Sequence, residues 1–405
     1  EEVDVKPLLS AGVLSVLVRA CMPTTRTVSK EDSKLRRDAL WALSYLAAHS
    51  DTSALAVEQA ASAILLEYAR GSDEYVKVPA FYALANAASW HDETRCQLLV
   101  FLPYLAEILT LAELTVSVTE AASFFLCTLL HAAKIPIKEA VTAKVDRVVA
   151  THLSAASFVS PVHRADLLWC MAYLTSSSAP EVVSLLNAKL FQLLFDLISL
   201  PDDATSTIAA ARIVGNAFGV NQVANQLVHS GPLLMALKSA LSHPHRAVRK
   251  EAAWVLSCIS SMGKQGSEKM VRFGFLPLLI ELFKNSGMDI QREIAFILMD
   301  VCFDGGPSFA KEMTENGALV PFIHLLHTHE VGVVRAALEF VRMVLDNLPE
   351  SVNLFEELDG IQALERVQDM DAPRLAGIAS MLIDRHYGED ANGLQPESSS
   401  GRTAQ

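Results

Sequence analysis

A mostly aromatic position recurs along this chain at nearly constant intervals. Successive copies are 41, 42, 45, 43, 42 and 42 residues apart, and a further step of 42 reaches Leu338. Each copy lies in an Ala- and Leu-rich stretch, such as "DALWALSYLAA" or "EAAWVLSCISS". The marker residues are Trp41, Tyr82, Phe124, Trp169, Arg212, Trp254 and Phe296. So regular a series indicates one structural unit repeated along the chain.

A glycine series runs in step with the markers. Gly231, Gly274, Gly317 and Gly360 are each 43 residues apart, and contexts such as "RFGFLPLLIELF" place a Pro just after the Gly. Glycine favours the end of one helix and proline the first turn of the next. An earlier copy surrounds Gly12. The series therefore predicts a helix boundary in each repeat.

Strand signals are nearly absent, whereas amphipathic segments of about 10–15 residues are frequent. A helical repeat near 42 residues is typical of armadillo and HEAT proteins, whose units stack because none buries its own apolar face. We predict an all-α fold, an armadillo-repeat right-handed superhelical solenoid. It spans residues 1–388 in about nine repeats. The polar, Ser-rich residues 389–405 are expected to be a disordered tail.

The composition of the chain limits which kinds of binding partner it can have. The 405 residues carry a formal net charge of -13 and are 51% hydrophobic. Acidic surfaces bind phosphate backbones poorly but attract basic partners, so no nucleic acid is expected. Six cysteines without a C-x-x-C pair suggest buried thiols in a reducing compartment. The start "EEVDVKPLL" is unlike a signal peptide and no apolar run could span a membrane, so we expect a soluble protein.

Within each recurring helix, the marker and the residue four positions later share one face. In a solenoid that face would line the concave surface, where rings sandwich Lys and Arg stems and attract their charged heads. Asn86 and Asn216 at the second position could bond a peptide backbone. Asp166, Glu251 and Glu293 lie three residues before a marker and would select basic side chains. The alternative, that the rings are core residues, stays open, although a buried Asn would need partners.

Several stretches resemble the importin-α family. "DLLWCMAYL" is similar to its acid-x-x-Trp-x-x-Ser-Tyr-Leu helix, and "AARIVGNAFG" to its Leu-Arg-x-x-Gly-Asn-Ile helix. "RKEAAWVLSCISS" resembles its Lys-Glu-Ala-x-Trp-x-x-Ser-Asn helix, and "LDGIQALERVQ" its closing Gly-Gly-Leu repeat. The resemblance covers nearly the whole chain and is strongest over residues 166–387. It implies a nuclear import adaptor that binds Lys/Arg-rich nuclear localisation signals as extended peptides.

The resemblance also implies site residues. The early-repeat, major-like site comprises Trp41, Tyr45, Tyr82, Asn86 and Phe124. The middle residues are Asp166, Trp169 and Tyr173. The later-repeat, minor-like site comprises Arg212, Asn216, Glu251, Trp254, Ser257, Glu293, Phe296 and Asp300. Because the early copies depart more from the family's Trp and Asn pattern, with Pro79 and Trp90 nearby, we expect stronger binding at the later site.

Further partners follow from the resemblance. The family binds importin-β through a basic N-terminal arm, and an export receptor at its C-terminal repeats, and it occupies the cytoplasm and nucleus. No Lys/Arg-rich arm precedes the repeats printed here, so an arm outside this stretch and function without one both stay open. An alternative function is a peptide-binding armadillo scaffold with no transport role.

No catalytic constellation is apparent. "FDGGPS" lacks the residues of a phosphate loop, and no G-x-S-x-G occurs. Three histidines, His324, His327 and His329, straddle a predicted helix end without completing a metal site. We therefore expect a protein that is not an enzyme and needs no cofactor or metal.

Overall fold

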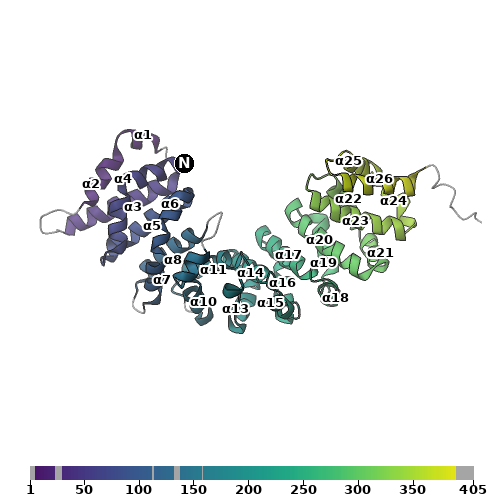
Figure 1. The fold of residues 1–405 in the computed structure, drawn as a ribbon, viewed down its shortest axis with the longest axis horizontal. Coiled ribbons are helices and arrows are strands. Elements are labelled where there is room, and N and C mark those ends of the chain that lie inside the picture. The colour runs from purple at the N-terminus through teal and green to yellow at the C-terminus, as the bar shows by residue number, and fades with distance from the viewer. Residues whose placement is uncertain (1–4, 23–29, 112–113, 132–136, 157, 389–405) are drawn as a thin grey trace, which may run out of the picture. The chain divides into compact units, whose positions relative to one another are not determined.

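The computed structural model describes residues 5–22, 30–111, 114–131, 137–156 and 158–388, and every regular element in these ranges is a helix (Figure 1). The predicted all-α class is confirmed. The predicted tail, residues 389–405, lies outside the described ranges. Within the described part of the chain, no helix combines the length and apolarity needed to cross a membrane.

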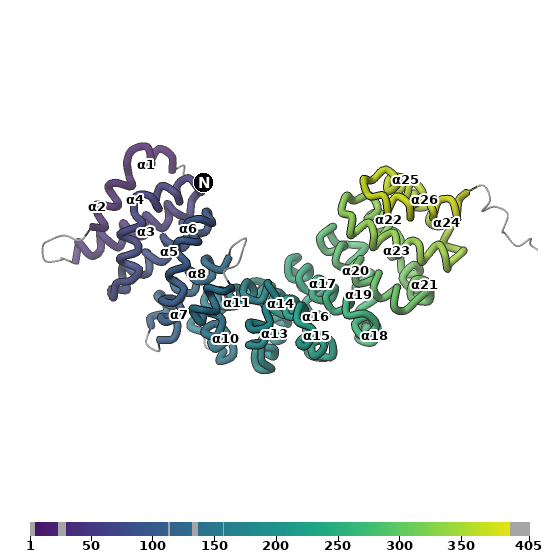
Figure 2. The backbone as a smooth tube through the Cα atoms, viewed as in Figure 1, coloured from purple at the N-terminus to yellow at the C-terminus, as the bar shows by residue number. Residues whose placement is uncertain are grey.

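Backbone contacts divide the chain into two compact units, Glu1–Val223 and Ala224–Gln405. In the first unit, five long helices pack in chain order, each against the next (Figure 2). These are α3 (Lys30–His49), α5 (Glu74–Trp90), α8 (Val116–Leu130), α11 (Pro161–Thr175) and α14 (Ala204–Ala217). One further helix, α4 (Asp51–Arg70), is as long as α3 and packs against both α3 and α5. The shorter elements before α3 and between these helices are α1 (Lys6–Ser10), α2 (Val13–Cys21), α6 (Asp92–Leu98), η1 (Leu99–Phe101), α7 (Leu102–Thr110), α9 (Ile137–Thr142), α10 (Val145–Ala155), α12 (Pro180–Val183) and α13 (Ala188–Ile198).

The second unit continues the same pattern. Its long helices also pack in chain order. They are α17 (Arg246–Ser260), α20 (Met288–Gly305), α23 (Val331–Asn347) and α26 (Pro373–Tyr387). The shorter helices are α16 (Gly231–Leu241), α18 (Lys264–Arg272), α19 (Leu276–Asn285), α21 (Pro307–Glu315), α22 (Leu319–Leu326), α24 (Glu350–Glu357) and α25 (Gly360–Gln368), while α15 (Asn221–Leu227) spans the division between the units.

The glycine series marks helix boundaries as the sequence predicts. Gly274 and Gly317 have φ values of 65° and 86° and lie between two helices, in a backbone region that other residues enter only at a cost. Gly231 and Gly360 are instead the first residues of α16 and α25. One boundary signal therefore corresponds to two local geometries.

Buried rings hold neighbouring helices together next to the marker position. In the first unit, the Phe125 ring centroid lies 5.8 Å from that of Phe81 and 5.6 Å from that of Phe101. All three side chains are at most 1% exposed. Since Phe81 and Phe125 directly adjoin the markers Tyr82 and Phe124, the ring that fills the core is the marker's neighbour in the chain.

Candidate functional site

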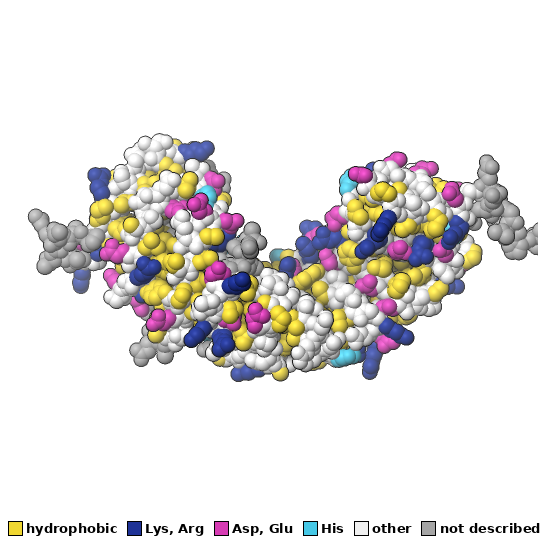
Figure 3. Space-filling view, in the orientation of Figure 1, with side chains coloured by type: hydrophobic (Ala, Val, Ile, Leu, Met, Phe, Trp, Pro, Cys, Tyr) yellow, Lys and Arg dark blue, Asp and Glu magenta, His cyan; other side chains and the backbone are white. Residues whose placement is uncertain are grey.

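The marker side chains lie at the edge of the core. Each of the seven is partly exposed, whereas Leu338, at the next step of the series, is fully buried. The partly exposed markers are Trp41, Tyr82, Phe124, Trp169, Arg212, Trp254 and Phe296. Hydrophobic and charged side chains are interspersed on the face of each unit shown in Figure 3. A partly exposed ring on a rigid helix can contact both the core and a ligand, which pure core residues cannot do.

The early-repeat rings touch one another. The centroid of Tyr82 lies 5.5 Å from that of Trp41 and 5.4 Å from that of Phe124, with interplanar angles of 30° and 39°. A methylene stem between two rings needs a separation of about 7 Å, twice the optimal carbon–carbon distance. The expected sandwich therefore does not fit between these rings in this conformation. They form a continuous aromatic surface instead, extended by Tyr45, which is 70% exposed.

The middle residues form a second aromatic group. Trp169 and Tyr173 on α11 have centroids 5.6 Å apart. Tyr173 also stacks on His131, at the end of α8, with centroids 5.0 Å apart and an angle of 16°. Burial raises the pKa of Tyr173, and the charge of Arg212 opposes that rise. Sequence reasoning missed His131 because its position does not follow the marker interval.

The two asparagines tie consecutive long helices together. Asn86 Nδ2 donates to the backbone oxygen of Ser44 at 3.1 Å, and Asn216 Nδ2 donates to that of Ala172 at 2.9 Å. Both acceptors lie three residues after the marker of the preceding repeat. The amide hydrogen used for this bond is not available to a bound peptide. Thr128, at the equivalent position, donates to the oxygen of Phe124 on its own helix at 2.9 Å.

The two acids that precede Trp254 and Phe296 are almost completely buried, unlike surface carboxylates at the edge of a binding groove. Glu251 and Glu293 are only 6% and 7% exposed. Glu293 accepts a hydrogen bond from Ser257 Oγ of the preceding repeat at 3.1 Å and pairs with Arg292 at 3.1 Å. A basic side chain of a ligand would reach these carboxylates only at their small exposed edges.

Two further acidic side chains accept hydrogen bonds from serine hydroxyls of the preceding repeat. Asp166 Oδ2 accepts from Ser123 Oγ at 2.9 Å, and Asp300 Oδ2 accepts from Ser260 Oγ at 2.7 Å. Burial raises the pKa of both carboxyls, that of Asp166 to about 6. The sequence analysis did not predict roles for Ser123 and Ser260. Each lies about one repeat length before the acid that it contacts, and this spacing could have suggested the pairing.

The predicted later-repeat set is distributed over both units. Arg212 and Asn216 belong to the first, on α14. The second unit holds Glu251, Trp254 and Ser257 on α17, and Glu293, Phe296 and Asp300 on α20. Helices α17 and α20 pack against each other, so their six residues lie on adjacent helices.

Comparisons with known proteins relate these features to a family. No protein-family profile matches the chain. Over 407 residues it is 26% identical to importin subunit alpha-9 of Arabidopsis thaliana, covering 95% of this chain and 76% of that protein. Over 244 residues it is 26% identical to importin subunit alpha-2 of Oryza sativa subsp. japonica, covering 56% of this chain and 46% of that protein.

The fold also matches a solved structure. A crystal structure of an engineered protein superposes with a TM-score of 0.73 at 20% identity, covering 94% of this chain and 90% of the other. At that identity the match concerns the fold alone, and it supports the predicted solenoid. Sequence relatives over nearly the whole chain and the repeated helical fold together show that the chain resembles the importin-α and armadillo-repeat family.

Proposed function

We propose that this protein is a nuclear import adaptor that binds Lys/Arg-rich nuclear localisation signals as extended peptides along its long helices. One observation carries the proposal: partly exposed rings recur at one position of successive packed helices in a chain related to importin-α over 95% of its length. Rings attract cationic side chains, and the net charge of -13 favours a basic peptide.

We propose that the second unit binds such signals more strongly than the early repeats. The contacts of Tyr82 with Trp41 and Phe124 leave no slot for a Lys stem, so a stem would lie across those rings. The second unit keeps Trp254 together with two acids, Glu251 and Glu293, on adjacent helices. The adaptor would then move between the cytoplasm and nucleus with importin-β and an export receptor as partners.

Fluorescence anisotropy with a labelled Lys/Arg-rich peptide tests this order. Trp254→Ala should weaken binding about ten-fold, since a desolvated cation–ring contact contributes about 1–2 kcal/mol. Trp41→Ala should change it less than three-fold. Trp90→Ala is the matched control, because Trp90 is 45% exposed but lies outside the marker series. A loss confined to Trp41→Ala would show that the early site dominates.

A peptide pull-down at moderate salt separates the adaptor from the scaffold alternative. The adaptor should retain basic import signals, and Glu251→Gln with Glu293→Gln should weaken that retention. These substitutions remove the charge but keep the size and one acceptor oxygen of side chains that are almost fully buried. Retention of neutral or acidic peptides only would favour a scaffold without a transport role.

A further inference from the structure

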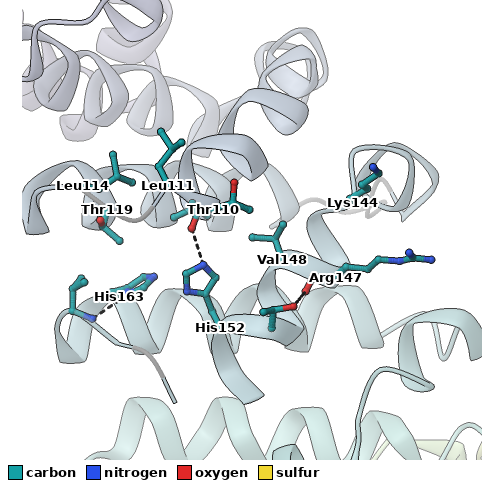
Figure 4. A pocket seen from close by; sticks show the side chains of 12 residues that line it. Thr110, Leu111, Leu114, Thr119, Lys144, Arg147, Val148, His152 and His163 are labelled. Atoms are coloured by element: carbon teal, nitrogen blue, oxygen red, sulfur yellow. Dashed lines mark hydrogen bonds between the residues drawn. The ribbon is translucent and has the colours of Figure 1, made fainter. Parts of the chain in front are cut away.

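A cavity between α20 and α23 in the second unit is lined by side chains that a ligand can reach. Its volume is about 330 Å³, which suits a large side chain of a ligand, and the exposed residues Phe303 and Arg335 line it. The larger cavity of the first unit, shown in Figure 4, differs in this respect. Its buried histidine nitrogens, His152 Nδ1 and His163 Nε2, are out of reach of a ligand.

The second-unit cavity lies where the repeat series reverses the charge of two positions. Between α17 and α20, Ser257 Oγ donates to Glu293 at 3.1 Å. Ser260 Oγ likewise donates to Asp300 at 2.7 Å. The residues 42 positions after these four are, in the same order, Met299, Arg335, Cys302 and Arg342. Both serine–carboxylate pairs are thus replaced by a sulfur side chain and an arginine, and all four replacements line the cavity. Positions that attract cations on α20 therefore attract anions on α23.

Arg335 provides the positive charge that a ligand can pair with. The guanidinium of Arg342 is already engaged, because it donates to Glu339 at 2.6 Å and lies 4.0 Å from Asp346. Arg335 is exposed, and among the residues that the structure describes none forms a hydrogen bond or an ion pair with its side chain. A carboxylate of a ligand would give this guanidinium a charge-assisted hydrogen bond.

The rest of the cavity is mainly apolar. Phe303, in the last turn of α20, is 71% exposed, so contact with a ligand would remove apolar surface from water. Cys302 and Phe340 are each 1% exposed, and burial raises the pKa of the Cys302 thiol to about 12, which keeps this wall uncharged at neutral pH. Met299 and Met343 are half-buried, and their flexible thioethers adapt to apolar side chains of different shapes.

We propose that this cavity binds a partner peptide through an acidic residue next to a large apolar one. The carboxylate would pair with Arg335, and the apolar side chain would contact Phe303 and the two methionines. Aromatic and arginine side chains are the ones that contribute most at protein interfaces. A small molecule would leave much of the Phe303 ring in water, whereas the residues that flank the contact in a peptide can cover it. This ligand is opposite in charge to a basic import signal, so the proposal does not depend on the function proposed above.

NMR of methionine methyl groups, together with fluorescence anisotropy, tests the proposal. Four short labelled peptides share one sequence except at two adjacent positions, which are aspartate–phenylalanine, asparagine–phenylalanine, aspartate–alanine or lysine–phenylalanine. The aspartate–phenylalanine peptide should shift the methyl signals of Met299 and Met343. It should bind about three- to five-fold more tightly than the asparagine peptide, as a partly exposed ion pair allows, and about ten-fold more tightly than the alanine peptide. The lysine peptide should bind more weakly than the asparagine peptide.

Variants of Arg335 assign the effect to this cavity. Arg335→Gln should remove the preference for aspartate over asparagine and leave the affinity for the asparagine peptide unchanged. Arg335→Glu restores the acid of the repeat series and should make the lysine peptide the preferred one. Neither substitution removes a hydrogen bond or ion pair from the described part of the protein, so both variants should fold. Arg374→Gln is the matched control, because Arg374 is an exposed arginine on α26 that does not line the cavity.

Equal affinity for the aspartate–phenylalanine and asparagine–phenylalanine peptides would overturn the proposal. A preference for aspartate that survives Arg335→Gln would overturn it as well, because the charge would then be recognised elsewhere. Methionine signals that stay in place with every peptide at several millimolar would show that no such segment binds this cavity.

Discussion

Replacing Asp166 with Asn should stabilise the protein at neutral pH and not at acidic pH. Asp166 is a partly exposed carboxyl on α11 whose pKa is raised from 3.8 to about 6 by burial, with a smaller contribution from the charge of Glu120. The Ser123 hydroxyl opposes the rise through its hydrogen bond. Asn keeps an oxygen that can accept this bond, so the substitution removes mainly the charge.

The sign of this effect on stability follows from the linkage between proton binding and folding. Between pH 3.8 and about 6, the folded chain holds the Asp166 proton while the unfolded chain has released it, so raising the pH favours the unfolded chain. The stability that the raised pKa provides is complete below pH 3.8 and is lost as the pH rises through about 6. Each pKa unit is worth about 1.4 kcal/mol, so the difference amounts to roughly 2–3 kcal/mol above that range.

Urea unfolding of both proteins at about pH 4.5 and about pH 7.5 measures this effect, because other titrating groups cancel in the comparison. The gain from Asp166→Asn should be at least 1 kcal/mol larger at the higher pH. Carbon NMR of the Asp166 carboxyl gives its pKa directly. A gain that stays constant across the pH range, or a measured pKa near 4, would refute the reasoning.

Two other substitutions test the packing between helices. Gly360→Ala should cost about 1–3 kcal/mol of unfolding free energy, since a Cβ would lie 2.4 Å from the buried Phe355 ring. Gly377→Ala, with no atom within 4 Å of its Cβ inside α26, should instead stabilise by about 0.5–1 kcal/mol, and thermal unfolding distinguishes the two. Asn216→Ala should cost about 1–3 kcal/mol in the same assay by removing the bond to Ala172, and an unchanged melting temperature would contradict that role.

The sequence predicted the features that depend on periodicity. A 42-residue interval of apolar segments requires stacked helical units, so the all-α solenoid follows from spacing. Spacing left open whether rings such as Trp41 and Trp254 are core residues, and the structure shows them partly exposed. The glycine series likewise predicted helix boundaries. These signals are local, and they survive at 26% identity to known relatives because each is repeated many times.

Contacts between repeats could not be predicted in the same way. The 5.5 Å contact between Trp41 and Tyr82 depends on the distance and rotation between two helices, which spacing along the chain does not specify. The pairing of Ser257 with Glu293 also joins different helices.

At some markers the polar residue four positions later connects neighbouring repeats, and this bears on how that position diverges. Asn216 connects its helix to the preceding one as a donor. Asp300, four residues after Phe296, makes the equivalent connection as an acceptor, from Ser260 at 2.7 Å. At Asp300 the hydrogen bond between repeats is therefore kept, but the side-chain amide that could hydrogen-bond a peptide backbone is absent. Because a carboxylate attracts cations but cannot donate to a carbonyl when charged, such a repeat should recognise basic side chains more than peptide backbone.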